Sequence, residues 1–155
     1  MGLQSNFAEE PVSALALRQA VTVDARATVR DAVRAMREHQ LGCVFIVDAQ
    51  ERPVGMFHER LLIQLLDEHP QALDESVARY LQRRCDCVRD SDPVGNVLYK
   101  VESDAKRFIG VVNQSGQLTG LTGERGLLEF VAEHFPRQVM VARPGMPRAA
   151  HCEGA

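Results

Sequence analysis

The feature that most constrains the fold of this chain is an internal duplication. When the sequence is displaced along itself so that Val12 falls on Val77, identical residues coincide over a long stretch without any gap. The identical pairs are Val12/Val77, Arg18/Arg83, Val23/Val88, Val29/Val94, Val47/Val112, Gly55/Gly120, Glu59/Glu124, Arg60/Arg125, Leu62/Leu127, Glu68/Glu133 and His69/His134. Because the signals for secondary structure fall into the same register, we interpret the chain as two copies of one folding unit.

The first copy predicts the order strand, helix, strand, strand, helix. Residues 21–23 form a short β run, and Thr28 with Asp31 makes a capping-box start for a helix. The apolar stripe of that helix consists of Val29, Ala32, Val33 and Met36. The elements expected next are a strand over 43–47, a turn over 48–53, a strand over 54–57 and a helix over 59–68.

The second copy repeats this order. Asp92 and Pro93 predict an N-cap and a first-turn proline, and the stripe returns as Val94, Val97, Leu98 and Val101. A strand over 108–112, a turn over 113–116, a strand over 118–122 and a helix over 124–134 follow. Short helical candidates, 12–17 and 76–82, precede the two copies. We therefore expect one repeat over residues 8–72, a second over 73–136 and a flexible tail over 137–155.

Composition excludes several classes of protein. The 155 residues carry a net charge of −3, which argues against a general nucleic-acid or anionic-membrane binder. Every apolar run is far shorter than the roughly 20 residues that span a bilayer, and the first ten residues lack the features of a signal peptide. We therefore expect a cytoplasmic protein.

The cysteines do not predict a metal site. Cys43, Cys85, Cys87 and Cys152 include no C-x-x-C pair, and a C-x-C pair on a strand places both side chains on one face. We interpret them as small apolar residues. The sequence also lacks a nucleophile elbow, an H-E-x-x-H motif, a Walker loop and a pair of carboxylates at a spacing that suits catalysis. We therefore expect no catalytic activity.

Order, spacing and duplication together resemble the cystathionine-β-synthase (CBS) domain pair, or Bateman module, over about residues 10–136. The segments that carry the resemblance are VTVDARATVRDAVRAM, CVFIVD, GMFHERLL, RFIGVVN and GLTGERGLL. The closing FVAEHFPRQV resembles the end of small stand-alone bacterial CBS-pair proteins. The resemblance implies an α/β (α+β) fold of two β-α-β-β-α repeats, packed sheet to sheet with pseudo-two-fold symmetry and two clefts.

In that family the clefts bind adenine nucleotides or related adenosyl compounds such as S-adenosylmethionine, as regulatory ligands. The candidate ligand-binding residues that the resemblance implies are Thr22, Val23, Phe45, Ile46, His58, Arg60, Val88, Ile109, Gly110, Gly123 and Arg125. Phe45 and Gly110 replace a proline that is common in the central strand of the family. An aromatic ring at Phe45 either stacks on an adenine or blocks it.

The family motif G-h-h-T-x-x-D is changed in both copies. His58 and Gly123 stand at the Thr position, and Leu61 and Gly126 stand at the Asp position that binds ribose. A hydrogen bond to a carboxylate contributes roughly 1.5–3 kcal/mol, so we expect nucleotide binding about ten- to a hundredfold weaker than in the family.

Arg60 and Arg125 remain near helix N-termini, where they either hold a phosphate or pair with a neighbouring Glu59 or Glu124. His58 is an anion donor or, more commonly for a histidine at such a turn, a helix cap. The repeated Glu-His pairs at the helix ends are better explained by the helix dipole than by a metal, since adjacent residues do not share a helical face.

Two classes of function follow. The first is a regulatory module that senses an adenosine-containing or other anionic metabolite. The second has lost the ligand and uses the fold to dimerise or to bind an unidentified protein partner. For a homodimer, the helix faces of Leu61/Leu65 and Leu127/Val131 are the candidate contact, unless they complete the core within the chain.

Overall fold

The computed structural model describes residues 3–83, 85–104 and 106–135, and the predicted tail over 137–155 lies outside them. The first repeat contains β1 (Thr22–Asp24), α2 (Val29–Glu38), β2 (Cys43–Val47), β3 (Pro53–His58) and α3 (Glu59–Glu68). The second contains β4 (Cys87–Arg89), α4 (Val94–Ser103), β5 (Ile109–Val112), β6 (Leu118–Thr122) and α5 (Glu124–His134). The predicted duplication and element order are confirmed.

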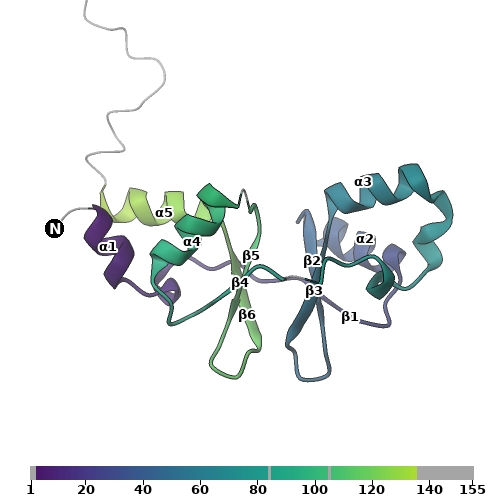
Figure 1. Ribbon diagram of the computed structural model, residues 1–155, viewed down its shortest axis with the longest axis horizontal. Coiled ribbons are helices and arrows are strands. Elements are labelled where there is room, and N and C mark those ends of the chain that lie inside the picture. The colour runs from purple at the N-terminus through teal and green to yellow at the C-terminus, as the bar shows by residue number, and fades with distance from the viewer. Residues whose placement is uncertain (1–2, 84, 105, 136–155) are drawn as a thin grey trace, which may run out of the picture.

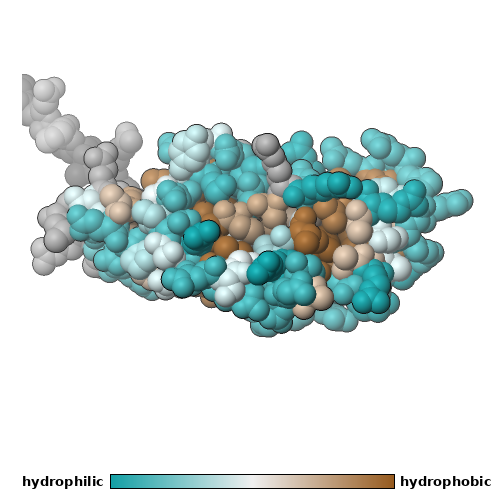
Figure 2. Space-filling view, turned by 60° about the horizontal axis from the view of Figure 1, so that its bottom comes forward, coloured by the Kyte–Doolittle hydropathy of each residue, from teal (hydrophilic) through white to brown (hydrophobic). Residues whose placement is uncertain are grey.

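Each repeat builds one three-stranded mixed sheet with the orders β1-β2-β3 and β4-β5-β6. The first two strands of each sheet are parallel, and the last two form an antiparallel hairpin. Figure 1 shows the two sheets side by side in the middle of the elongated molecule, with α2 and α3 beside one and α4 and α5 beside the other. The predicted sheet-to-sheet α/β fold is confirmed. In Figure 2 hydrophobic side chains gather near the middle of one face.

Local sequence signals explain most of the helix boundaries. Thr28 accepts a hydrogen bond from the Asp31 N–H, and Asp31 accepts one from the Thr28 N–H, so the predicted capping box starts α2. The prediction at α4 was wrong, because its N-cap is Pro93 and no side chain caps it. The Asp92 carboxylate instead accepts from the Arg89 N–H at 2.9 Å, which closes the turn after β4.

The helical candidates before each repeat are shorter than expected. They form single 3₁₀ turns, η1 (Val12–Ala14) and η3 (Val77–Arg79), and a further 3₁₀ segment, η2 (Pro70–Asp74), precedes η3. The predicted repeat boundary after residue 72 falls inside η2. The sequence analysis also missed α1 (Leu3–Glu9), which packs on the second repeat, where the rings of Phe7 and Phe130 are 5.8 Å apart.

The two repeats exchange the segments that precede them. The Val12 N–H donates to the Asp92 carbonyl, and the Val77 N–H donates to the Ala27 carbonyl. In the duplication Val77 is the equivalent of Val12, and Ala27 is the equivalent of Asp92. The two hydrogen bonds therefore correspond to each other, with the roles of the two repeats exchanged. The bridges Pro11/Pro93 and Thr28/Ser76 follow the same rule. This reciprocity is the pseudo-two-fold symmetry that the family resemblance implied.

The cores are exchanged in the same way. Val77 and Ala72 lie in the core of the first repeat, and Val12 and Leu15 lie in the core of the second. All four side chains are buried. Neither repeat therefore completes its core with its own strands and helices alone.

The central strands of the two sheets, β2 and β5, contact each other where the large side chain of Phe45 faces Gly110, which has no side chain. Phe45 of β2 is fully buried, and a Cβ on Gly110 of β5 would lie 3.0 Å from the Phe45 ring and 2.8 Å from Cys87 Sγ. The ring of the first repeat thus occupies the space that glycine leaves in the second. Because these positions are equivalent in the duplication, the junction is filled asymmetrically.

Truncation of this ring tests its role in the junction. We expect Phe45→Ala to lower the free energy of unfolding by about 3–5 kcal/mol, since it leaves a cavity between the two sheets. Chemical denaturation measures the loss. Tyr99→Ala is the control, because Tyr99 is 65% exposed and its truncation is expected to cost less than about 0.5 kcal/mol. Equal losses in the two variants would contradict the junction that we describe.

Candidate functional site

The larger cleft at the junction lies beside the start of α3, and we call it the α3 cleft. Its volume is about 650 Å³. The first repeat contributes the end of β3 and the first turns of α3, and the second contributes the segment before β4 and the loop before β5. The lining residues are Met56, His58, Glu59, Arg60, Leu61, Gln64, Gln82, Asp86, Asp104, Lys106, Arg107 and Phe108.

A smaller cleft, the α5 cleft, occupies the related position beside the start of α5. Its volume is about 230 Å³. Its lining residues are Ala16, Arg18, Arg107, Phe108, Leu121, Thr122, Gly123, Glu124, Arg125, Gly126 and Glu129. Arg107 and Phe108 line both clefts, so the loop before β5 separates them.

The predicted site residues divide into two groups. His58 and Arg60 line the α3 cleft, and Gly123 and Arg125 line the α5 cleft. The other seven do not line either cleft: Thr22, Val23, Phe45, Ile46, Val88, Ile109 and Gly110. Five of those seven, Phe45, Ile46, Val88, Ile109 and Gly110, are buried. Phe45 is therefore part of the packed junction and presents no ring to a ligand in either cleft.

His58 is the N-cap of α3. Its Nδ1 accepts a hydrogen bond from the Leu61 N–H at 3.2 Å, as a neutral imidazole can. Burial lowers the pKa of His58, and the nearby Arg60 acts in the same direction, while a hydrogen bond with Gln82 opposes the shift. The cap interpretation of His58 is confirmed.

The corresponding turn of the second repeat depends on close packing. No side chain caps α5 at Gly123, where a Cβ would lie 2.5 Å from the Arg107 carbonyl oxygen. A Cβ on Gly126 would contact Oγ1 of Thr122, which is buried and has no hydrogen-bond partner among the described residues. The two glycines at the changed motif positions thus make room for Arg107 and Thr122.

The two retained arginines have different surroundings. Arg125 pairs with Glu129 at 3.0 Å, one helical turn away, and not with Glu124 as expected. Arg60 forms no ion pair with any residue that the structure describes. The expected partner of Arg60, Glu59, pairs instead with Arg107 of the second repeat at 3.0 Å. Arg60 is thus available to an anion in the α3 cleft.

A second ion pair lies in the wall of the α3 cleft. Asp86 is 14% exposed, and its Oδ2 lies 3.0 Å from Lys106 Nζ. Lys100 Nζ lies 3.8 Å from its Oδ1. The cleft has three cationic and three acidic side chains in its lining, apart from His58, and two of each are joined in ion pairs.

Sequence analysis missed the residues that reach each cleft from the other repeat. Asp86, Lys106 and Arg107 come from segments beside β4 and β5, far along the chain from α3. The backbone explains their placement, since the Gln82 N–H bonds to the Met56 carbonyl, and the Met56 N–H to the Gln82 carbonyl. The duplication aligns Arg107 with Gly42, whose carbonyl accepts from the Glu59 N–H within the first repeat, so it gave no sign that the Arg107 side chain reaches the other repeat.

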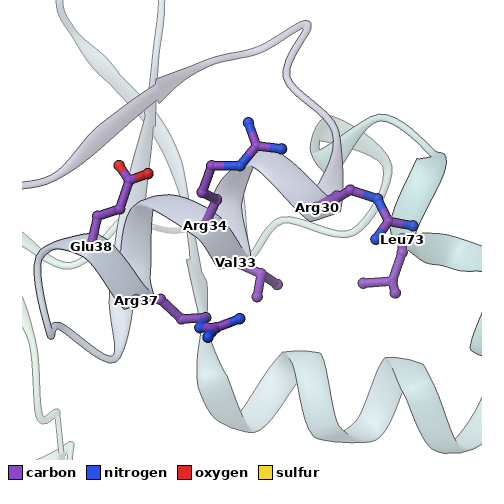
Figure 3. A pocket seen from close by; sticks show the side chains of 6 residues that line it. All are labelled: Arg30, Val33, Arg34, Arg37, Glu38 and Leu73. Carbon is purple, nitrogen blue, oxygen red and sulfur yellow. The ribbon is translucent and has the colours of Figure 1, made fainter.

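A third groove, of about 620 Å³, lies outside the junction along α2 (Figure 3). Arg30, Arg34 and Arg37 extend from one side of this helix, and Leu73 of η2 borders the groove. Arg30 pairs with Asp74 at 3.0 Å, and Arg34 lies 3.5 Å from Asp31. The exposed pairs indicate a solvated helix face.

The described residues form neither a metal cluster nor a membrane-spanning helix. Within the part of the chain that the structure describes, no group of three or more His, Cys, Asp or Glu side chains could hold a metal ion. The helices described there are all too short or too polar to cross a membrane. His69 bonds to Glu75 at 3.0 Å, and His134 stacks on Phe130.

Comparison with known proteins identifies the fold. Residues 12–68 match the family model of the CBS domain. An uncharacterised 17.7 kDa protein of Acidianus ambivalens is 26% identical over 116 residues, which cover 75% of this chain and 70% of the relative. A protein of Methanopyrus kandleri is 27% identical over 119 residues, which cover 76% of this chain and 61% of the relative.

Two solved structures share the architecture. The CBS domain protein PAE2072 of Pyrobaculum aerophilum, complexed with AMP, superposes with a TM-score of 0.70 at 24% identity, covering 85% of this chain and 96% of that one. The CBS domain pair of protein MJ0100, in complex with 5′-methylthioadenosine and S-adenosyl-L-methionine, gives a TM-score of 0.68 at 15% identity, covering 81% and 98%.

The cap at His58 predicts a pH dependence. The unfolded histidine takes up a proton near pH 6.5, but the folded one does so only at lower pH, so the stability from neutral His58 is complete above pH 6.5 and is lost as pH falls below it. We expect His58→Asn, which keeps a capping oxygen, to reduce this acid-side loss. Urea unfolding of both proteins at several pH values measures the difference.

His58→Ala is the matched variant without a cap. It is expected to lower the free energy of unfolding by about 0.5–2 kcal/mol at neutral pH, while His58→Asn stays close to the parent protein. Identical pH profiles for the parent and both variants would show that His58 is not the titrating group.

Proposed function

We propose that the chain, whose residues 12–68 match the CBS-domain model and which folds as a CBS-domain pair, is a non-catalytic regulatory module that binds an adenosine-containing or other anionic metabolite between its repeats. The α3 cleft is the proposed primary site. The observation that carries the proposal is the position of Arg60, which pairs with no acidic residue that the structure describes, at the N-terminus of α3 and inside a cleft large enough for a nucleotide. The proposed location is the cytoplasm, where the reduced thiol is the ordinary state of cysteine.

The choice of an adenosyl ligand is supported by the structural neighbours. One neighbour is complexed with AMP, and another with 5′-methylthioadenosine and S-adenosyl-L-methionine. In this chain neither Leu61 nor Gly126 has a carboxylate for a ribose, so the anionic part of the ligand contributes most of the affinity through Arg60. A ligand changes the arrangement of the repeats only through different affinity for two arrangements.

The alternative function is a ligand-free module for dimerisation or for binding another protein. Two observations in the structure support this alternative. Phe45 occupies the junction between the central strands, and two acidic side chains of the α3 cleft already pair with two of its three cationic ones. A protein that needs no ligand retains such interactions for stability alone.

Thermal unfolding with a panel of ligands distinguishes the two functions. The panel consists of AMP, ADP, ATP, S-adenosylmethionine and inorganic phosphate. A ligand at a hundred times its Kd adds about 2.7 kcal/mol of stability, and we expect Tm to rise by roughly 5–10 °C with at least one adenosyl compound. Absence of any shift would favour the interaction module.

Arginine variants then locate the site. Arg60→Ala is expected to remove most of the shift, and Arg125→Ala to remove less, since Arg125 is already paired with Glu129. Arg37→Ala is the matched control, because Arg37 lies in the outer groove along α2. A shift that survives Arg60→Ala would remove Arg60 from the site.

We also propose that the chain forms a homodimer through the outer faces of α3 and α5. Leu65 and Leu127, which the sequence analysis offered for this contact, are buried within the chain. The exposed apolar side chains are instead Ile63 at 68% and Leu128 at 62%. They occupy equivalent positions in the two repeats, so one symmetrical contact can cover both.

A charge on either position tests the dimer. We expect Ile63→Glu and Leu128→Glu each to convert a dimer into a monomer, because dimerisation would bury an unpaired carboxylate. Light scattering coupled to size-exclusion chromatography measures the mass. Val54→Glu, an exposed position at the start of β3, is the control and is expected to leave the dimer intact. A parent protein that is monomeric at high concentration would overturn the proposal.

A further inference from the structure

The sulfurs of Cys85 and Cys87 form a pair at the junction of the repeats. Their Sγ atoms lie 3.3 Å apart and share a hydrogen bond. Both side chains are partly buried and pack against the core of the first repeat, although β4 belongs to the second. The C-x-C motif of the sequence is therefore a vicinal dithiol and not only a pair of small apolar residues.

The surroundings of the pair differ between the two thiols. The hydrogen bond with Cys85 lowers the pKa of Cys87, while burial and the neighbouring Asp86 carboxylate oppose the shift and Lys100 adds to it. The same hydrogen bond raises the pKa of Cys85. Cys87 is thus the thiol that ionises first, and Cys85 stands beside it as the second thiol.

The third described cysteine is a natural contrast. Cys43 is fully buried on β2, and burial raises its pKa to about 12. It has neither the exposure nor the ionisation that a reactive thiol needs. In the first repeat, the positions equivalent to Cys85 and Cys87 are Ala20 and Thr22, so the dithiol exists in one repeat only.

We propose that Cys85 and Cys87 are a site of reversible oxidative modification by peroxides. The Cys87 thiolate attacks one oxygen of hydrogen peroxide, which breaks the O–O bond and gives a sulfenic acid and water after proton transfer. Cys85 then attacks the Cys87 sulfur, which forms the S–S bond and releases a second water. Two thiols and one peroxide thus yield one disulfide and two waters, and the thiols lose two electrons to the peroxide.

Geometry favours this step. A disulfide needs an S–S distance of about 2.05 Å, so the sulfurs have to approach by little more than 1 Å from their contact distance. Only Asp86 separates the two cysteines, and such a short loop gives a strained disulfide that thiols reduce readily. The modification is therefore reversible by dithiothreitol.

The disulfide would act on the wall of the α3 cleft. Asp86 lines that cleft, its carboxylate pairs with Lys106, and its carbonyl accepts from the Gly110 N–H at 2.8 Å. Closing the loop around Asp86 displaces these contacts. The proposal does not rest on the proposed function, since the chemistry requires no nucleotide.

Peptide mapping tests the modification on the full chain. The protein is treated with hydrogen peroxide, alkylated with iodoacetamide and analysed by mass spectrometry. We expect Cys85 and Cys87 to become protected together, with the loss of two hydrogen atoms from the peptide, and dithiothreitol to restore alkylation of both. Protection of neither, or a bond from either to Cys43 or Cys152, would overturn the proposal.

Variants separate the pair from other thiols. Cys43→Ser is the matched control and is expected to form the same disulfide, whereas Cys85→Ser and Cys87→Ser are expected to form none within the chain. If a serine variant fails to fold, phenylarsine oxide provides a test on the unaltered protein, because trivalent arsenic binds two adjacent thiols together. Alkylation of both cysteines in the presence of the arsenical would count against a vicinal dithiol.

Amide hydrogen exchange tests the link to the cleft. Exchange at Gly110 is expected to differ between the oxidised and reduced proteins and to return with dithiothreitol. Unchanged exchange at Gly110 would overturn the effect on the cleft wall. None of these measurements uses a nucleotide, so their failure is distinguishable from failure of the proposed function.

Discussion

The exchange of backbone hydrogen bonds between the repeats is the interaction on which the rest of this structure depends. The segment before each repeat bonds to the other repeat, through Val12 to Asp92 and through Val77 to Ala27. Buried N–H and carbonyl groups need such partners, and the Val12 and Val77 N–H groups find theirs in the other repeat. The exchange also brings the segments beside β4 and β5 against the start of α3, and so creates the α3 cleft. Fold and site therefore have one cause.

The backbone of the two repeats is symmetrical, but the side chains that fill the junction between them are not. Phe45 and Gly110 occupy the same position in the two repeats, yet one provides a ring and the other the space for it. The Cys87 sulfur also lies over Gly110, in a space that a second aromatic side chain would take. Asymmetry at one pair of positions thus explains both the packed centre of the molecule and the location of the dithiol.

The sequence was sufficient for the architecture because the duplication repeats each signal. Helix stripes, strand runs and the Thr28 capping box each depend on neighbours in the sequence, so they could be predicted locally. The Asp92 cap failed for a local reason, since its carboxylate is already used by the Arg89 N–H. The helix α1 lacks an apolar stripe and is held by tertiary contacts, such as that of Phe7 with Phe130.

The site was less predictable because it is assembled from both repeats. His58 could be interpreted from its own turn, but Arg107 and Asp86 reach the α3 cleft only through the exchange of segments. The burial of Phe45 depended on which residue faces it across the junction. Comparison of Phe45 with its equivalent, Gly110, held that information, but only once the two positions were known to be in contact.

The two changed ribose positions differ in what they would allow. Gly126 is packed against the buried Thr122 hydroxyl, so any side chain there has to displace the start of α5 or Thr122 itself. Leu61 is only partly buried and lines the larger cleft, beside the unpaired Arg60. A carboxylate in place of Leu61 would therefore border the cleft, whereas a side chain at Gly126 would meet the Thr122 hydroxyl. Packing thus closes this motif position to a side chain in the α5 cleft, whereas the equivalent position borders the larger α3 cleft.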